Sequence, residues 1–266
     1  MTRILIPTDF SGNALAATDA AISLFGAEAD YTMLHLYHEP YAAATSMISL
    51  VDIAMQDSRR SLKEELERIH TKFGKDLRIS GLSEYGDGGR QIASLAARMN
   101  IDLIVMGTKG ASGLKEVLVG SVAAATINSS SRPVLIIPEG VVVNRDSFKT
   151  WVVAVDDLRN TEILTPVRAI AKLFSASLRF LRIIQGEKGH TNGHDTRPAY
   201  LLGDEGYTEL AAEEPVSGIA EFLRRNTTDV LVMFPGNHGF MDRIFKRSNT
   251  GKMAMHAGLP LLTVHK

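Results

Sequence analysis

The sequence predicts an α/β fold made of two tandem, doubly wound parallel-sheet (Rossmann-like) domains, and three observations support this prediction. First, the pattern strand, turn, helix, strand occurs twice along the 266 residues. Second, the expected strands, such as LIVM, VLII, VLVM and LLTV, are apolar throughout, which is typical of parallel strands covered by helices on both faces. Third, these strands alternate with stretches of helical periodicity. We expect the domains to span residues 1–143 and 150–266.

The repeat can be followed from one copy to the other. Residues 4–39 read as an apolar strand, a turn, an amphipathic helix and a second strand, and residues 151–186 follow the same plan. The strand and glycine loop around Gly107 recur around Gly236, and the final strand at Pro133 recurs at Pro260. Because self-similarity of this kind indicates a repeated structural unit, both halves are expected to share one fold.

The spacing between the copies locates a difference between them. Asp9 and Asp156 are 147 residues apart, whereas Gly107 and Gly236 are 129 residues apart, so about 18 residues are missing from the second copy. The first copy has a helical run in that region, with apolar positions at Leu62, Leu66, Ile69 and Phe73. The second copy instead has a stretch rich in Gly, Asp and Asn, which is typical of a loop. We expect the second copy to lack its second helix.

Composition and charge exclude several classes of function. The chain has no cysteine, so it has no disulfide, thiolate metal site or cysteine nucleophile, and a reducing, cytoplasmic compartment is expected. The 29 basic and 30 acidic residues are dispersed and give a net charge of -1, which provides no field for recruiting nucleic acid or an anionic membrane. We also expect neither a signal peptide nor a membrane span, because no stretch has the required apolar length.

A glycine-rich loop in the first half is the strongest candidate for a ligand site. Gly107 and Gly110 are separated by two residues, and nine more residues lead to Gly120 and Ser121. The loop joins an expected strand to an expected helix, whose first N–H groups can bind an anion such as phosphate. Open α/β sheets bind ligands at the carboxyl ends of their strands, which favours a site over a purely structural turn. The dinucleotide GxGxxG pattern and the Walker ending Gly-Lys-Ser/Thr are both absent.

The spacing GxxGx9G[ST], with PTDFS after the first strand and RPVLIIP at the last, closely resembles the universal stress protein family over almost the whole first domain. The resemblance implies an adenine nucleotide alpha hydrolase-like fold that binds ATP, or ADP or AMP, with or without Mg²⁺. It implies that Asp9 contacts the ribose, that the backbone at Leu36 holds adenine, and that the glycine loop holds the phosphates. The implied site residues are Pro7, Thr8, Asp9, Leu36, Met106, Gly107, Gly110, Gly120, Ser121 and Val122.

Other residues carry weaker signals. An aspartate after a strand commonly closes a turn or caps the next helix, so Asp9 and its repeat partner Asp156 have this second interpretation. His190, His194 and Asp195 are metal-ligand types, but they lie in a stretch typical of a solvated loop, and we predict no metal site. We also predict no catalytic residue, because no nucleophile and base can be paired.

The second half departs from the pattern of the first. Its loop reads Gly236, two residues, Gly239, nine residues and then Asn249, so asparagine replaces the third glycine, and Pro235 precedes the loop. Asparagine tolerates the turn, but its side chain occupies space that a phosphate needs. We expect this half to bind nucleotide weakly or not at all.

The leading hypothesis is therefore an adenine-nucleotide-binding regulatory protein of the stress response, with at most slow ATP hydrolysis. The alternatives are an interaction scaffold that needs no nucleotide, and a slow ATPase or autophosphorylating switch. The resemblance also implies that the two domains pair as a pseudo-dimer within one chain, through the apolar final strands PVLIIP and PLLTVH, and that a homodimer can form. No protein partner is predicted.

Overall fold

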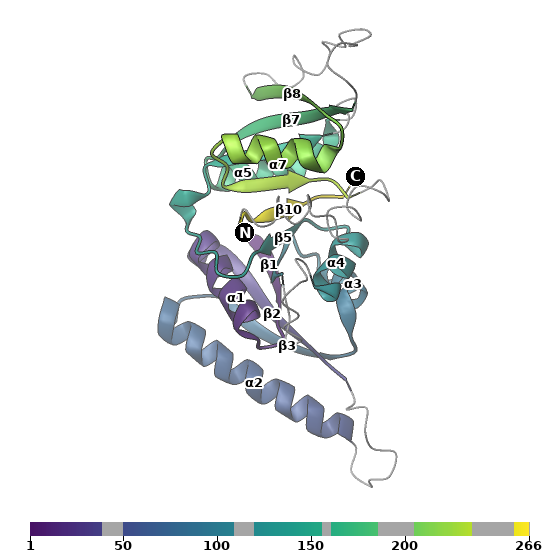
Figure 1. The fold of residues 1–266 in the computed structure, drawn as a ribbon. Helices are drawn as coiled ribbons and strands as arrows, with labels where there is room; N and C mark the ends of the chain where they lie inside the picture. The colour runs from purple at the N-terminus through teal and green to yellow at the C-terminus, as the bar shows by residue number, and fades with distance from the viewer. Residues whose placement is uncertain (39–49, 109–119, 156–160, 186–204, 236–257, 266) are drawn as a thin grey trace. The chain divides into compact units, whose positions relative to one another are not determined.

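The computed structural model describes residues 1–38, 50–108, 120–155, 161–185, 205–235 and 258–265. Its parallel strands alternate with helices (Figure 1), which confirms the predicted α/β fold class. The chain divides into two compact units, Met1–Gly140 and Val141–Lys266. The predicted domain bounds, 1–143 and 150–266, stay predictions.

The first unit contains a parallel sheet with the strand order β3-β2-β1-β4-β5. Its elements are β1 (Thr2–Pro7), α1 (Gly12–Phe25), β2 (Ala29–Tyr37), α2 (Leu50–Phe73), β3 (Ile79–Tyr85), α3 (Gly88–Arg98), β4 (Leu103–Gly107), α4 (Ser121–Ser129) and β5 (Val134–Ile137). The chain adds strands on one side of β1 and then continues on the other side with β4. This reversal of strand order creates the crevice in which open α/β sheets bind ligands.

Helices cover both faces of this sheet. Helices α1 and α2 lie on one side, and α3 and α4, which pack against each other, lie on the other (Figure 1). Ile4, Leu5 and Ile6 in β1 are fully buried, because a strand between two layers of helices meets water on neither face. The uniformly apolar strands seen in the sequence follow from this arrangement.

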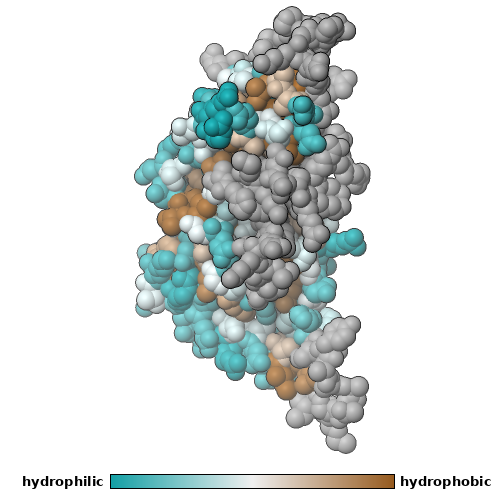
Figure 2. Space-filling view, in the orientation of Figure 1, coloured by the Kyte–Doolittle hydropathy of each residue, from teal (hydrophilic) through white to brown (hydrophobic). Residues whose placement is uncertain are grey.

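Helix α2 occupies the place of the helical run predicted between the second strand and the glycine loop. It has 24 residues, and hydrophilic residues dominate the outer surface in this part of the molecule (Figure 2). Its inner side buries Leu62 and Ile69, as the periodicity indicated, but also Ser58 and Glu65. Two polar residues are therefore buried on the face of α2 that the sequence pattern predicts to be apolar.

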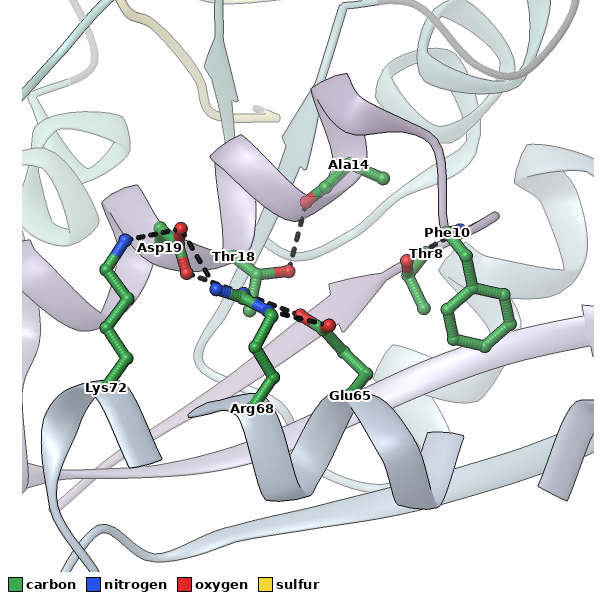
Figure 3. Close-up of polar contacts among 8 residues, drawn as sticks. All are labelled: Thr8, Phe10, Ala14, Thr18, Asp19, Glu65, Arg68 and Lys72. Atoms are coloured by element: carbon green, nitrogen blue, oxygen red, sulfur yellow. Dashed lines mark hydrogen bonds and ion pairs between the residues drawn. The ribbon is translucent and has the colours of Figure 1, made fainter. Parts of the chain in front are cut away.

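Charged side chains join α2 to α1. Arg68 Nη2 donates to Asp19 Oδ1 at 2.7 Å and to Glu65 Oε1 at 2.6 Å, and Lys72 Nζ donates to Asp19 Oδ2 at 2.8 Å (Figure 3). Burial alone would raise the pKa of Asp19, but the hydrogen bonds and charges of Arg68 and Lys72 outweigh it and lower the pKa below its usual value. The Asp19 carboxylate is therefore stabilised in its charged form.

The second unit has the strand order β10-β9-β6-β7-β8. Its elements are β6 (Thr150–Val155), α5 (Thr165–Leu173), β7 (Ser177–Gln185), β8 (Gly206–Ala212), α7 (Pro215–Arg225), β9 (Val230–Met233) and β10 (Leu261–Thr263). This order corresponds strand for strand to β5-β4-β1-β2-β3, so the repeat extends to the topology. The predicted loss of the second helix concerns residues that lie outside the described part of the chain.

An aromatic cluster forms part of the core of the second unit. The Trp151 ring centroid lies 6.0 Å from that of Phe148 and 5.9 Å from that of Phe174, and Trp151 Nε1 donates to the Phe148 carbonyl at 3.2 Å. Because the indole N–H has a partner, this large side chain can be buried without losing a hydrogen bond. Across the described residues of both units, the helices are all too short or too polar to cross a bilayer.

Candidate functional site

A cavity of about 360 Å³ lies at the carboxyl ends of β1, β2 and β4, beside the starts of α3 and α4. Nine of the ten residues implied by the family resemblance line it: Pro7, Thr8, Asp9, Leu36, Met106, Gly107, Gly120, Ser121 and Val122. The tenth, Gly110, lies outside the described residues. The cavity is at the edge of the sheet where its strand order reverses, as expected for a ligand site in this class of fold.

The turn between β1 and α1 forms one wall of the cavity. The Thr8 N–H donates to the Leu34 carbonyl at 2.8 Å, which ties the end of β1 to β2. Asp9 Oδ1 accepts from the Ser11 N–H at 3.0 Å, and Ser11 Oγ in turn accepts from the Ala14 N–H at 3.3 Å as the cap of α1. Asp9 therefore has the turn-closing role named as its alternative, and it also lines the cavity.

The connection from β4 to α4 forms the opposite wall. The Gly120 N–H donates to the Thr108 carbonyl at 2.5 Å, and Asn13 Nδ2 donates to Thr108 Oγ1 at 3.5 Å. A Cβ atom on Gly107 would lie 2.8 Å from Asn13 Nδ2 and 3.1 Å from the Asn13 carbonyl oxygen, so the close approach of α1 favours glycine there. Helix α4 then begins at Ser121, and the first N–H groups of a helix are available to an anion.

The comparison with known families agrees with this geometry. A model described as the universal stress protein family matches residues 1–138. The chain belongs to the universal stress protein family. All of the described residues that line the cavity lie within the matched residues.

Individual relatives show how far the likeness extends. Universal stress protein YxiE of Bacillus subtilis is 29% identical over 144 residues, which cover 51% of this chain and 97% of the relative. Universal stress protein MJ0577 of Methanocaldococcus jannaschii is 28% identical over 152 residues, which cover 51% of this chain and 93% of the relative. Each of these sequence matches accounts for about half of this universal stress protein.

A solved structure extends the likeness in fold to the whole chain. The universal stress protein of Archaeoglobus fulgidus DSM 4304 superposes with a TM-score of 0.73, covering 99% of this chain and 96% of its own. The sequences are 17% identical, so this likeness concerns the fold and not the site. The likeness in fold over the whole chain agrees with the common strand order of the two units.

Sequence reasoning missed a third wall of the cavity, the turn between β3 and α3. Gly86, Asp87 and Gly88 line the cavity, and Gly86 and Gly88 have φ angles of 141° and 73° that favour glycine. The Gly86 N–H donates to the Tyr37 carbonyl at 2.8 Å, which holds this turn against the end of β2. The glycine-rich stretch GDGG, which follows β3 directly, was the signal that could have revealed it.

Sequence reasoning also missed apolar and polar lining residues that carry no motif. They are Ala14, Leu34, His35, His38, Ile92, Thr108 and Ala123. The apolar members come from strands and helices, where they read as ordinary core residues. Their place at the cavity depends on which strands are neighbours and on how far each strand extends, and neither is visible in a local pattern.

The charge of the described lining is carried by Asp9 and Asp87, together with the titratable His35 and His38, while lysine and arginine are absent from it. Burial lowers the pKa of His35; the nearby Asp9 charge opposes this effect and His38 adds to it. The neutral imidazole is therefore favoured. In the described part of the chain, no group of three or more suitable side chains could hold a metal ion.

The corresponding positions of the second unit cannot be compared in the same way. Asp156, Gly236, Gly239 and Asn249 all lie outside the described residues. Pro235 is described and lies two residues after the end of β9 at Met233. The weaker nucleotide binding expected for this half therefore stays a prediction.

Proposed function

We propose that the first unit binds an adenine nucleotide, namely ATP or its relatives ADP and AMP, and that this binding regulates a stress response. The observation that carries the proposal is the convergence of nine implied site residues on one cavity at the switch point of the sheet. These residues come from the ends of β1, β2 and β4 and from the start of α4, which are far apart in the sequence. The cavity volume also lies within the range typical of small-molecule sites, about 300–1,000 Å³.

The chemistry of the lining suits the parts of a nucleotide. Leu34, Leu36, Ile92 and Met106 provide apolar surface for a base, and strand-end backbone groups can supply the directed hydrogen bonds that select adenine. Asp9 offers a carboxylate that can accept hydrogen bonds from ribose hydroxyls. The proposed pose follows the family resemblance, with the base near β2 and the ribose near the β1–α1 turn.

The phosphates would lie over the start of α4. Its N–H groups and the Ser121 hydroxyl are hydrogen-bond donors, and the helix dipole adds positive potential there. Because the described lining contains two carboxylates and no lysine or arginine, Mg²⁺ held mainly by phosphate oxygens would offset part of the negative charge of ATP. We therefore propose the nucleotide with Mg²⁺ as the bound form of ATP.

The second unit is proposed to be a degenerate universal stress protein domain that contributes packing and regulation. A cytoplasmic location is part of the same proposal, because a chain without cysteine suits a reducing compartment. We propose at most slow ATP hydrolysis. An ATPase would need turnover above that of a variant with an altered glycine loop.

The experiment that tests the proposal is identification of the nucleotide carried by the purified protein. The protein is denatured, the supernatant is analysed by mass spectrometry, and the stripped, refolded protein is titrated calorimetrically with ATP, ADP, AMP and GTP. We expect an adenine nucleotide in the supernatant and micromolar binding, which corresponds to roughly -8 kcal/mol. Absence of any adenine nucleotide together with no heat of binding would favour the scaffold alternative.

A further inference from the structure

A chain of polar side chains connects the cavity to helix α2. His35 Nδ1 lies 2.8 Å from Ser58 Oγ, and Ser58 Oγ lies 2.6 Å from Ser83 Oγ, so the three groups are linked by hydrogen bonds. They come from three elements, β2, α2 and β3. Ser58 is only 2% exposed, and a buried hydroxyl without a partner would carry a cost of about 1–3 kcal/mol. Helix α2 therefore packs on the sheet in this position, which we call its seated position, only when Ser58 forms hydrogen bonds with His35 and Ser83.

On its other side, His35 contacts the turn that carries Asp9. The Phe10 and His35 ring centroids are 4.6 Å apart, and Phe10 has a φ of 60°, a left-handed conformation that is unfavourable for a bulky residue. The Phe10 N–H donates to Thr8 Oγ1 at 3.0 Å, while Asp9 Oδ1 accepts from the Ser11 N–H. The conformation of Phe10 thus determines how Thr8 and Asp9 are presented to the cavity.

The second unit provides an internal comparison for this arrangement. The strand registers place Arg182 of β7 at the position that His35 has in β2. The cross-strand partner of His35 is Ser83, and that of Arg182 is Glu209. There Arg182 Nη1 donates to Glu209 Oε1 at 3.3 Å, and the Tyr207 hydroxyl donates to the same oxygen at 2.7 Å. The sheet itself therefore accepts an ion pair at these positions.

The difference between the units corresponds to α2. The connection from β7 to β8 comprises residues 186–205, which number 20, fewer than the 24 residues of α2 alone. Among the described residues, α2 therefore has no counterpart in the second unit. The hydrogen-bonded residues His35, Ser58 and Ser83 lie in the unit that contains α2. This indicates that they hold α2 against the edge of the sheet where the cavity lies.

The environment of His35 keeps its ring neutral. Asp9, from the β1–α1 turn, favours the charged ring, whereas burial and His38, from the end of β2, disfavour it, and the pKa of His35 is lowered. The groups that contact the ring from α2 and the β1–α1 turn are a hydroxyl and a phenyl ring, Ser58 and Phe10. A neutral imidazole can share one hydrogen bond with Ser58 and still pack on Phe10.

We propose that His35 is a positioning residue of the nucleotide site, which holds the turn from Thr8 to Ser11 through Phe10 and couples it to the seating of α2 through Ser58. This inference rests on the proposed function and adds regulation of the same site. None of the described residues that line the cavity belongs to α2. Linkage between two sites is reciprocal, so nucleotide binding stabilises the seated helix, and displacement of the helix weakens nucleotide binding.

The test is amide hydrogen exchange of the full chain with and without ATP, together with ATP affinity by calorimetry. Exchange reports local opening of an element, and α2 does not touch the ligand in the proposed site. In the unmodified protein we expect ATP to slow exchange within α2. In Ser58→Ala the slowing is lost and ATP affinity falls about fivefold, the lower end of typical coupling energies.

Matched variants separate coupling from general damage to the fold. Thr71→Ala also removes a hydroxyl from α2, but Thr71 is exposed and bonds only to its own helix at Glu67 O, so it should behave as the unmodified protein. His35→Phe keeps a ring against Phe10 and leaves Ser58 bonded to Ser83, so it should resemble Ser58→Ala. His35→Ala also loses the ring contact and should bind ATP more weakly still.

Each outcome decides between the two proposals. If ATP binds the unmodified protein but exchange within α2 does not change, the coupling is wrong and nucleotide binding stands. The same holds if Ser58→Ala and Thr71→Ala give equal affinity and equal protection. If the unmodified protein binds no ATP, the proposed function fails and the coupling fails with it.

Discussion

The backbone N–H of Gly120 donates to the Thr108 carbonyl oxygen at 2.5 Å, which fixes the start of α4 beside the end of β4. Both residues line the cavity. A valine at position 120 would place a branched side chain where phosphates are proposed to meet the first N–H groups of α4. We therefore expect Gly120→Val to abolish ATP binding in calorimetry. The control is Gly206→Val in the second unit. A Cβ atom there would lie 3.8 Å from Arg179 Cγ, an ordinary van der Waals contact, so this variant should leave ATP affinity unchanged. Equal affinities for the two variants would mean that the phosphates lie elsewhere.

Gly89 permits the close packing of α3 on α4. An added Cβ would lie 2.3 Å from both Thr126 N and Val122 O, which are backbone atoms and cannot move alone. Gly89→Ala should therefore lower the free energy of unfolding by about 1–3 kcal/mol, measured by urea denaturation. It should also weaken ATP binding, because Val122 lines the cavity. The control is Gly12→Ala, whose Cβ meets nothing within 4 Å; similar losses in both variants would contradict the argument.

Arg68 holds two carboxylates, and its removal leaves a buried charge without a partner. The Glu65 side chain is 7% exposed and depends on Arg68. Arg68→Met should destabilise the protein by about 1–3 kcal/mol in urea denaturation. This is less than the roughly 3–5 kcal/mol for breaking a fully buried ion pair, because the Arg68 side chain is 35% exposed. Arg60→Met removes an exposed partner of Asp57 and should change stability by about 0.5 kcal/mol or less. An equal effect of the two substitutions would argue against an energetic role for the network.

The same network predicts a dependence on pH. The folded-state pKa of Asp19 lies below its usual value of 3.8, so the unfolded chain binds the proton more readily. The stability that Asp19 contributes is fully present above pH 3.8 and is lost as pH falls through the lowered, folded-state pKa. Unfolding free energies measured from pH 6 downward should therefore show a smaller acid-induced loss in Asp19→Asn than in the unmodified protein. Parallel curves for the two proteins would contradict the predicted role of Asp19.

The number of nucleotide sites per chain tests the difference between the two halves. We expect one site under saturating ATP, because Asn249 replaces the third loop glycine and Pro235 precedes the second loop. Substitutions at Gly236 or Gly239 should leave that stoichiometry unchanged. Asn249→Gly restores the spacing of the first loop, and any second site that it creates should be weaker than the first. Two equivalent sites in the unmodified protein would overturn the prediction.

Separately expressed halves should associate. Within its own unit, β5 pairs with β4 and β10 pairs with β9, and both final strands are apolar. An apolar edge strand without a second partner tends to pair with another chain. Residues 1–140 and 141–266 are therefore expected to be poorly soluble or to self-associate alone, and to form a complex when mixed. Two well-behaved monomers in sedimentation analysis would speak against the proposed pseudo-dimer.

The fold class and two of the three turns that line the cavity could be predicted because their signals are local. A strand covered on both faces must be apolar at successive positions, so each buried strand is visible as a short run of letters. A turn that brings the backbone close to a ligand or to another helix favours glycine. The spacing of Gly107 and Gly120 is therefore visible in the sequence as a sign of such a turn. Repetition of both signals predicted two units with one fold, and the structure gives both units the same strand order.

The tertiary structure decided which polar residues meet. Ser58 and Glu65 lie on the buried side of a helix whose periodicity marks only apolar positions, and their partners are assigned by the contacts of α2 with β2, β3 and α1. His35 and Ser58 are 23 residues apart, and Asn13 and Thr108 are 95 apart. Single serines, histidines and asparagines occur throughout any sequence, and hydrogen bonds form between whichever donors and acceptors the packing brings within about 3 Å. The sequence therefore determined the strands, the glycine turns and the repeat. Packing alone determined the series of hydrogen-bonded side chains that links the cavity to α2.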